Sequence, residues 1–434
     1  MNVLKSSIPS RLAVAGSLFS MAVMLAACGG GSDASNDVAT LSSQPMSATE
    51  TTQAYADAAA PRAQPAAWEL AEDPATEQAF LASQLSRAAR ETAMNLADTR
   101  TKWNPGHYIA TGKRDPATVA QILTEIDDFP QVKGLLLRYE WAQLETAKGV
   151  YDFSKIDRDL ATMAAAGKRL FVMVSTKVFT SGGRAVPDYL RTAEYEGGAY
   201  KILIGAREAI DSENRYGENA ALHNANVRDR LIALTTALGK RYNGHNAFEG
   251  VTFNETAIGT TQVPMTSAQL TAYFANLAQI DTATKQAFPN TVVMQFINYP
   301  RPYMPGLISN MVSSKVALGG PDIFLEDWDL NTRVYPMYDP AKGQVPIGPS
   351  VQPENYQATV QNGPVNPPKI ADLYSFGRTR LNANYMFWTR SFIGSPAPYP
   401  QLLQFFRSSA FPKDAAGGLT TTCPATFASC VPKL

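Results

Sequence analysis

A short run near the middle of the chain decides the fold: FEGVTFNE, at residues 248–255. Its first six residues are mostly aromatic, β-branched or small, which is typical of a buried strand. A carboxylate follows at Glu255, just after the apolar run ends. A carboxylate in that place costs stability unless it is paired or used. The stretch therefore predicts a core strand that delivers a functional acid.

Seven further apolar runs alternate with helical patterns on both sides of this strand. They lie at residues 107–111, 134–139, 169–174, 291–296, 316–320, 345–351 and 384–388. Helical patterns occupy about 115–128, 153–166, 227–242, 267–288, 368–381 and 401–407, and a short segment at 302–314 follows the fifth run. Such alternation favours parallel strands covered by helices. Eight units predict an α/β fold, a (β/α)8 or TIM barrel.

The connection after the third strand, residues 179–226, is longer than most loops in compact domains. The barrel is therefore expected to carry a long insertion there. Within it, a Gly-Gly turn flanked by aromatic residues at 195–200 indicates a hairpin over the cleft.

Catalytic residues of such barrels gather at the C-terminal ends of the strands. The predicted strand ends carry His107, Tyr139, Lys177, Asn254, Glu255, Tyr299, Asp322, Gln352, Glu354 and Trp388. Any of these side chains could equally be a hydrogen-bonded rim residue without a role. For Glu255 the functional interpretation is favoured, because of the cost of leaving its charge unpaired.

Two motifs resemble those of the clan A glycoside hydrolases. The Asn-Glu pair at residues 254–255 resembles the acid/base motif that closes the fourth strand of that clan, where Glu protonates the leaving oxygen and Asn contacts the sugar. Residues 138–157 are similar to its second strand and loop, with a Trp-x-x-x-Glu and a Gly-x-Tyr-Asp-Phe-x-x-x-Asp pattern. The resemblance covers most of residues 101–400 and implies a glycosidase acting on a poly- or oligosaccharide.

The substrate-binding residues are expected among the residues at the strand ends. They are His107, Tyr139, Asn254, Tyr299, Asp322, Gln352 and Trp388, and for Asn254 and Trp388 the resemblance itself implies a contact with the sugar. The tryptophans that are candidates for stacking on sugar faces are Trp103, Trp141, Trp328 and Trp388. Core packing is the alternative for each of them.

The second carboxylate is ambiguous. Glycoside hydrolysis normally needs two, about 5 to 5.5 Å apart for retention and about 6.5 to 9.5 Å apart for inversion. In clan A the nucleophile is a Glu ending the seventh strand, where this chain has Gln352 and, two residues later, Glu354. We expect Glu354 to be the nucleophile of a retaining enzyme, and Glu255 to be an acid whose pKa is raised by burial or by its partner.

Other carboxylates could take the place of Glu354. They are Asp322, Glu326, Asp327 and Asp329. The departure from the clan A pattern at Gln352 also leaves open another class of protein, a surface lipoprotein whose degenerate barrel binds glycan without cleaving it.

The N-terminus predicts export. Residues 1–11 are short and basic and residues 12–25 are apolar, which is typical of a secretory signal and too short for a stable membrane span. Residues 25–28, Leu-Ala-Ala-Cys, resemble a bacterial lipobox, which implies cleavage before Cys28 and lipid attachment to its thiol. No Asp stands just after Cys28 to mark retention at the inner membrane, so the rule for bacterial lipoproteins favours the outer membrane.

Three regions follow from this interpretation. Residues 1–27 are the lipoprotein signal peptide, 28–98 the lipidated N-terminus with a low-complexity linker, and 99–434 the glycoside hydrolase-like domain. In an oxidising compartment, Cys423 and Cys430 are expected to form a small terminal disulfide.

Composition excludes several function classes. Lys and Arg number 38 and Asp and Glu also number 38, so no excess of basic charge favours nucleic acid. Serine-hydrolase, phosphate-loop and metalloprotease motifs do not occur, and the three His residues are scattered. We therefore expect a monomer with a carbohydrate substrate, a membrane contact through its lipid anchor, and no metal or cofactor.

Overall fold

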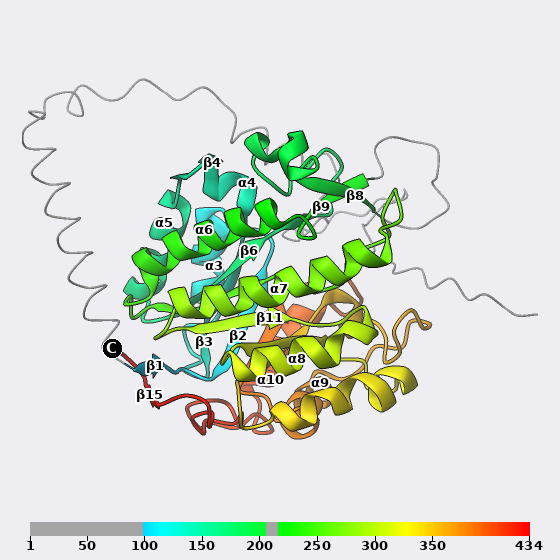
Figure 1. The fold of residues 1–434 in the computed structure, drawn as a ribbon. Helices are drawn as coiled ribbons and strands as arrows, with labels where there is room; N and C mark the ends of the chain where they lie inside the picture. The colour runs from blue at the N-terminus through cyan, green and yellow to red at the C-terminus, as the bar shows by residue number, and fades with distance from the viewer. Residues whose placement is uncertain (1–98, 205–215) are drawn as a thin grey trace, which may run out of the picture.

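The computed structural model describes residues 99–204 and 216–434 (Figure 1). The predicted signal peptide, the lipidation at Cys28 and the linker up to residue 98 lie outside the described residues. Within the described ranges, no helix combines the length and the apolarity that crossing a membrane requires.

Eight parallel strands close into a barrel, which confirms the predicted α/β fold (Figure 1). The strands are β2 (Gly106–Thr111), β3 (Val132–Glu140), β6 (Arg169–Ser175), β10 (Phe248–Phe253), β11 (Val292–Phe296), β12 (Ala317–Asp322), β13 (Ile347–Val351) and β14 (Tyr385–Thr389). Each pairs with the next barrel strand along the chain, and β14 closes the ring on β2. Every predicted strand overlaps its observed counterpart.

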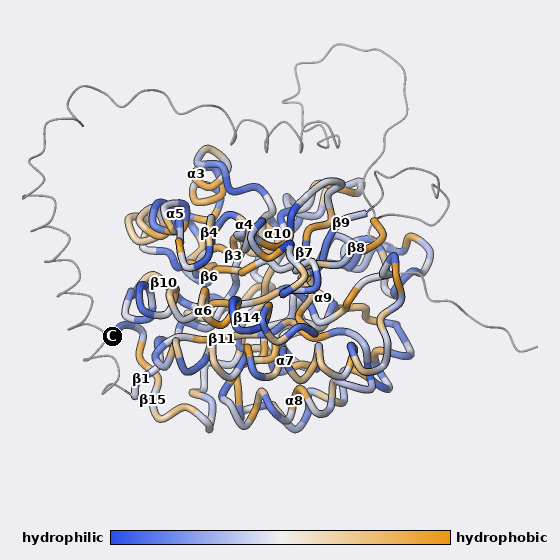
Figure 2. Tube along the Cα trace, turned by 45° about the horizontal axis from the view of Figure 1, so that its top comes forward, coloured by the Kyte–Doolittle hydropathy of each residue, from blue (hydrophilic) through white to orange (hydrophobic). Residues whose placement is uncertain are grey.

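Helices surround this barrel. They are α3 (Pro116–Glu125), α5 (Ser154–Ala165), α6 (Ala225–Tyr242), α7 (Ser267–Ala287), α8 (Met304–Ser313), α9 (Ile370–Ser375) and α10 (Pro398–Arg407). Figure 2 shows apolar and polar residues alternating along them, as expected for helices with one face against the barrel. After β12 the return is irregular, a π turn η6 (Leu330–Val334) and a 3-10 turn η7 (Tyr335–Ala341), because prolines interrupt the helix.

Strand side chains divide into two packed layers. Those facing the bore include Tyr108, Phe171, Met294, Phe296, Tyr385 and Phe387, while their sequence neighbours pack against the helices. Glycines make room for the rings in the bore: a Cβ on Gly250 would lie 2.0 Å from the ring of Phe171, and one on Gly319 would lie 1.9 Å from that of Phe296. The bore is therefore filled, and a ligand can be reached only at the mouth.

The segment between β6 and α6 forms a small antiparallel sheet. Its strands are β7 (Lys177–Val178), β9 (Tyr216–Ala220) and β8 (Ala199–Leu203), in that spatial order. The Gly-Gly turn at residues 195–200 precedes β8 and does not connect β8 to β9, so the hairpin expected there is wrong. The sheet starts two residues after β6 and therefore places Lys177 directly at the mouth.

The opposite end of the barrel is closed by both ends of the described chain. Strand β1 (Arg100–Lys102) pairs in parallel with β15 (Ser429–Val431). Cys423 and Cys430 form a disulfide beside this pair. Trp103 packs edge-on against Tyr385 at the start of β14, with ring centroids 5.5 Å apart. Trp103 thus lies at the floor of the barrel, which corrects its candidacy for stacking on a sugar at the mouth.

Candidate active site

Glu255 lies at the mouth of the barrel, two residues beyond β10, with a buried lysine behind it. The Nζ of Lys177 is 3.1 Å from Oε1 of Glu255. The same ammonium also donates to the backbone oxygens of Glu255 and Ala257. The side chain of Lys177 is 1% exposed and that of Glu255 is 30% exposed. The carboxylate can therefore be reached from solvent, while its counter-ion cannot.

This lysine reverses the expected titration of Glu255. Burial alone would raise the pKa of the carboxyl, but the charge of Lys177, hydrogen bonds from the backbone and from Lys177, and the charge of Arg138 lower it below its ordinary value. The expectation of a raised pKa is wrong, because the sequence did not reveal the buried cation. Glu255 is therefore ionised at neutral pH.

Asp322 shows the opposite behaviour at the end of β12. Its carboxyl is half-buried and makes no hydrogen bond or ion pair with another described residue. Burial raises its pKa to about 7, and the charges of Glu354 and Glu255 add to the effect. Because Asp322 responds to both of these charges, the three carboxyl groups belong to one site.

Gln352 and Glu354 approach the same site from the end of β13. Ser350 is the register partner of Asp322, and Nε2 of Gln352 donates to Oγ of Ser350 over 2.7 Å. Glu354 lies in the 3-10 turn η8 (Pro353–Tyr356), where burial raises its pKa. The charge of Glu354 contributes to the raised pKa of Asp322, although the strand itself ends at Val351.

The remaining acidic candidates, Glu326, Asp327 and Asp329, make contacts that stabilise the loop after β12. Glu326 accepts a hydrogen bond from Oγ1 of Thr359 over 2.6 Å. Asp327 accepts from the backbone nitrogens of Leu330 and Gln361, over 2.9 and 3.0 Å. Asp329 forms ion pairs with Arg301 and Arg333. These three carboxyl groups are thus hydrogen-bonded or ion-paired, whereas that of Asp322 has no such partner among the described residues.

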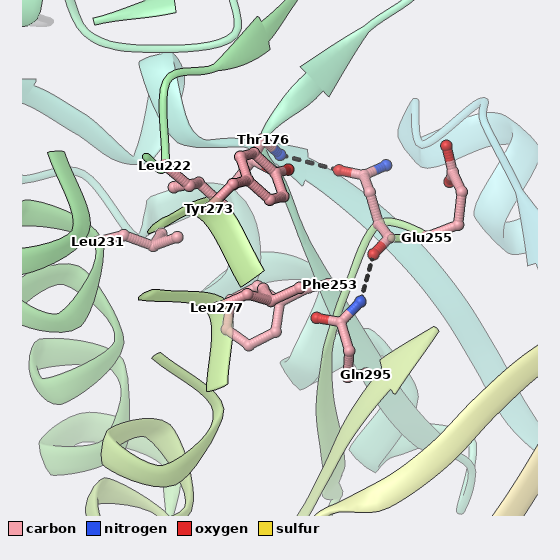
Figure 3. Close-up of a pocket in the computed structure, with 9 residues that line it drawn as sticks. Thr176, Leu222, Leu231, Phe253, Glu255, Tyr273, Leu277 and Gln295 are labelled. Atoms are coloured by element: carbon pink, nitrogen blue, oxygen red, sulfur yellow. Dashed lines mark hydrogen bonds between the residues drawn. The ribbon is translucent and has the colours of Figure 1, made fainter. Parts of the chain in front are cut away.

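Asn254 is largely occupied by structural hydrogen bonds. It is 3% exposed, and its Oδ1 accepts from the backbone nitrogen of Thr176 over 2.8 Å. Gln295 donates to the backbone oxygen of Asn254 over 2.7 Å (Figure 3). Asn254 and Gln295 both line a small pocket, in which Figure 3 shows Leu231 and Leu277 on one side and Glu255 on the other. Its volume of about 10 Å³ suits about one water molecule.

Tyr299 remains on the rim. It follows β11, is half-buried, and its hydroxyl donates to Oε1 of Gln361 over 2.7 Å. Trp328, in the loop after β12, is 66% exposed, with the guanidinium of Arg333 5.2 Å from its ring centre. Trp141 is fully buried and donates to Glu145, so its candidacy for sugar stacking is corrected.

Three predicted substrate contacts are placed elsewhere by the structure. His107, Tyr139 and Trp388 are at most 1% exposed and lie between the strands and the helices. Nε1 of Trp388 donates to Nδ1 of His107 over 2.9 Å, and the hydroxyl of Tyr139 donates to Asp159 over 2.8 Å. Burial also lowers the pKa of His107 to about 4. The expectation that these side chains line the cleft is therefore corrected.

His107 is the second residue of β2 and therefore lies at the end of the barrel opposite the mouth. For Tyr139 and Trp388 the physical reason is the alternation of side chains along a strand. Leu136 packs in the bore and Leu135 and Leu137 face the helices, so the next inward position on β3 belongs to Arg138 and not to Tyr139. Arg138 is half-buried, and its charge acts on both Glu255 and Lys177. Sequence reasoning missed it, although counting in steps of two from Leu136 finds it.

Within residues 99–204 and 216–434, no three His, Cys, Asp or Glu side chains gather as metal ligands would.

Comparison with known proteins finds likeness only at the level of structure. No family model and no curated protein matches the chain. The catalytic domain of β-amylase from Paenibacillus polymyxa is 9% identical, with a TM-score of 0.49 over 71% of this chain and 99% of that one. A β-galactosidase from Bacillus circulans is 11% identical, with a TM-score of 0.47 over 69% of this chain and 52% of that one.

A third structure, endo-glycoceramidase II from Rhodococcus, is 15% identical, with a TM-score of 0.42 over 67% of this chain and 75% of that one. All three likenesses are too distant to transfer an activity or a residue role to this chain.

Proposed function

We propose that the protein is a glycoside hydrolase in which Asp322 and Glu255 are the two working carboxyl groups. The observation that supports this is the opposite displacement of their pKa values at one barrel mouth. Asp322 keeps its proton up to about pH 7, while the buried Lys177 holds Glu255 ionised. Two carboxyl groups whose surroundings push their pKa values apart are what acid-assisted glycoside cleavage requires.

In this mechanism Asp322 donates its proton to the glycosidic oxygen as the bond to the anomeric carbon breaks. An oxygen of Glu255 attacks that carbon and forms a glycosyl ester, and the leaving sugar departs as an alcohol. The Asp322 carboxylate then takes a proton from water, whose oxygen displaces Glu255 from the anomeric carbon. This scheme retains the anomeric configuration and returns both groups to their starting states.

Glu354 has a supporting role in this scheme. The negative charge of Glu354 helps to raise the pKa of Asp322 and so helps to keep Asp322 protonated. Gln352 and Tyr299 supply uncharged polar groups at the rim that suit sugar hydroxyls. Asn254 contributes only its Nδ2, whose sole contact among the described residues is Sδ of Met173 at 4.0 Å.

The test measures reducing ends released by the full-length chain from a panel of bacterial and plant glycans. We expect Asp322→Asn to lose activity by about 10²- to 10⁴-fold on these glycans and to recover on aryl glycosides whose leaving groups need no proton. Glu255→Ala should be inactive on both, and azide should restore turnover by forming a glycosyl azide. Glu326→Gln is the matched control. The carboxyl of Glu326 accepts a hydrogen bond from Thr359 and has no role in the proposed mechanism.

Two results would replace this assignment. If azide rescues Glu354→Ala and not Glu255→Ala, Glu354 is the nucleophile. If no glycan is cleaved by the wild type but glycans still bind, the barrel is a glycan-binding lipoprotein, a function that Gln352 at the end of the seventh strand also fits.

We further propose that a lipid on Cys28 anchors the protein in the bacterial outer membrane. The support is the sequence alone, the basic and apolar start followed by Leu-Ala-Ala-Cys. Cys28→Ala should abolish incorporation of labelled palmitate and shift the protein from the membrane fraction to the soluble fraction. Unchanged labelling in Cys28→Ala would contradict the proposal.

A further inference from the structure

We propose that the barrel mouth binds an anionic group of the glycan, a carboxylate or a sulfate, through the guanidinium of Arg138. This inference rests on the proposed function for the sugar part of the ligand. The anion site itself rests on the placement, the pairing and the charge of Arg138.

Arg138 lies on the inward face of β3, near the C-terminal end of that strand. Its register partner is Met173 on β6, whose side chain belongs to the cluster that fills the bore. Arg138 is one inward step beyond Leu136, which packs in the same cluster. Its guanidinium therefore stands above the filled bore, on the surface that a ligand at the mouth would touch.

The other cations around the mouth already have partners. Arg114 pairs with Glu140 over 3.0 Å, Lys177 pairs with Glu255, and Arg301 pairs with Asp329. Arg138 makes no hydrogen bond or ion pair with any other described residue. Its planar fork of donors is thus available, and that fork matches a carboxylate or a sulfate better than it matches a sugar hydroxyl.

The charge balance at the mouth also favours an anion. Lys177 cancels the charge of Glu255, and Asp322 is uncharged below about pH 7. Glu354 adds a negative charge that acts on Asp322, but it lies on the turn after β13, three strand positions from β3, and makes no ion pair with Arg138. Burial lowers the pKa of Lys177, and the charge of Arg138 adds to this effect. Holding two cations close together costs stability, and an incoming anion would offset that cost.

The ring of strands sets where the anion would lie. Strand β3 is four positions from β12 in both directions around the barrel, so Arg138 lies across the mouth from Asp322. Glu255 on β10 lies between them. A glycan spanning the mouth would place its anionic group against β3 and the bond to be cleaved against β10 and β12.

The test is calorimetric binding at pH 6 with the full-length chain carrying Asp322→Asn, so that no ligand is consumed. The ligands are hexuronic acid oligosaccharides, sulfated oligosaccharides, and neutral oligosaccharides of the same length. Arg138→Met removes the charge, Arg138→Lys keeps the charge without the fork, and Lys240→Met is the charge-matched control. Lys240 is exposed in the last turn of α6, at the opposite end of the barrel.

We expect Arg138→Met to weaken binding of one acidic class by about 10- to 100-fold, and Arg138→Lys to weaken it less. Neutral glycans and the Lys240→Met control should change less than twofold. The class affected identifies the anion as carboxylate or sulfate. Without ligand, Arg138→Met should unfold at a higher temperature than the parent, a result that a purely structural role would not give.

The failures of the two proposals are distinguishable. Equal binding of acidic glycans to Arg138→Met and to the parent would overturn the anion site. If the wild type cleaves neutral glycans and binds no acidic ones, the anion site is overturned as well. The proposed glycosidase activity is then supported. Acidic glycans that bind through Arg138 and are never cleaved would leave the anion site in place and overturn the glycosidase.

Discussion

Lys177 lowers the pKa of Glu255. Removing Lys177 should therefore raise that pKa and change how hydrolysis depends on pH. The pKa of Glu255 is lowered in the folded protein, so the carboxylate persists to low pH. In Lys177→Met that pKa should rise, and Glu255 should become protonated as the pH falls towards 5. We expect hydrolysis relative to wild type to be about tenfold lower at pH 5 than at pH 7.

The measurement is a pH–rate profile of hydrolysis. Lys177→Arg is the control, because it keeps the charge and should leave the acid limb of the profile nearly unchanged. A loss in Lys177→Met that is the same at every pH would mean that Lys177 only holds the loop after β10 through its backbone hydrogen bonds.

The residue scale also shows what the sequence could predict. Glu255, Asp322 and Gln352 were found because each ends a strand whose limits are clear from its apolar run. Tyr139 and Trp388 were misplaced by one position, because strands buried on both faces carry continuous apolar runs that hide which side faces the bore. His107 was misplaced along its strand: it is the second residue of β2 and lies at the end of the barrel opposite the mouth. The ion pair of Lys177 and Glu255 joins residues 78 positions apart, and no local pattern contains it.

At the scale of single elements, α7 carries a buried acid. Asp281 is fully buried, and neither of its carboxyl oxygens has a hydrogen-bond partner among the described residues. Burial therefore raises its pKa well above the ordinary value. The folded protein keeps this proton while the unfolded chain releases it, so Asp281 costs stability increasingly as the pH rises above about 4.

Asp281→Asn should remove this cost. In the range where only the folded state keeps the proton, the cost grows by about 1.4 kcal/mol per pH unit. We expect the variant to be more stable than wild type at pH 8, with the difference shrinking towards pH 5. Urea unfolding across this range measures it, with the exposed Asp229→Asn on α6 as control. A difference that is independent of pH would show that Asp281 is ionised in the folded state.

The loop between β12 and η6 presents an aromatic side chain to solvent. Trp328 is 66% exposed, yet its loop is fixed by the hydrogen bonds of Glu326 and Asp327. An exposed aromatic ring on a fixed loop is suited to stacking on a sugar away from the cleaved bond. We expect Trp328→Ala to weaken binding of long oligosaccharides by about 5- to 10-fold and to leave disaccharides unaffected.

Affinity as a function of chain length tests this, with Trp328→Phe expected to keep most of the binding. Equal losses for short and long ligands would place Trp328 at the reacting sugar instead.

For the whole molecule, periodicity was enough to predict the barrel, since eight strand and helix patterns in sequence have few other arrangements. The pairing that closes the floor of the barrel could not be predicted from local sequence patterns. Strand β15 pairs with β1, about 330 residues earlier in the chain. Neither three-residue strand is recognisable alone, and each is stabilised by its partner and by contacts with the barrel.

The floor gives the molecule a redox-dependent stability. The disulfide between Cys423 and Cys430 encloses Phe427, whose ring packs edge-on against Trp103 with centroids 6.3 Å apart. Opening a loop of this length should cost about 2 kcal/mol of unfolding free energy. We expect Cys423→Ser/Cys430→Ser to unfold at a lower denaturant concentration than the oxidised wild type, and to match the wild type once a reductant is added.

The mouth lies at the other end of a filled barrel, so kcat on any cleaved glycan should be nearly unchanged in the double variant below its unfolding transition. Denaturation followed with and without reductant, beside activity at low temperature, separates the two effects. A loss of activity in a variant that is still folded would show instead that the floor and the mouth are coupled through the packed bore, because the rings that touch Trp103 belong to the cluster that fills the bore.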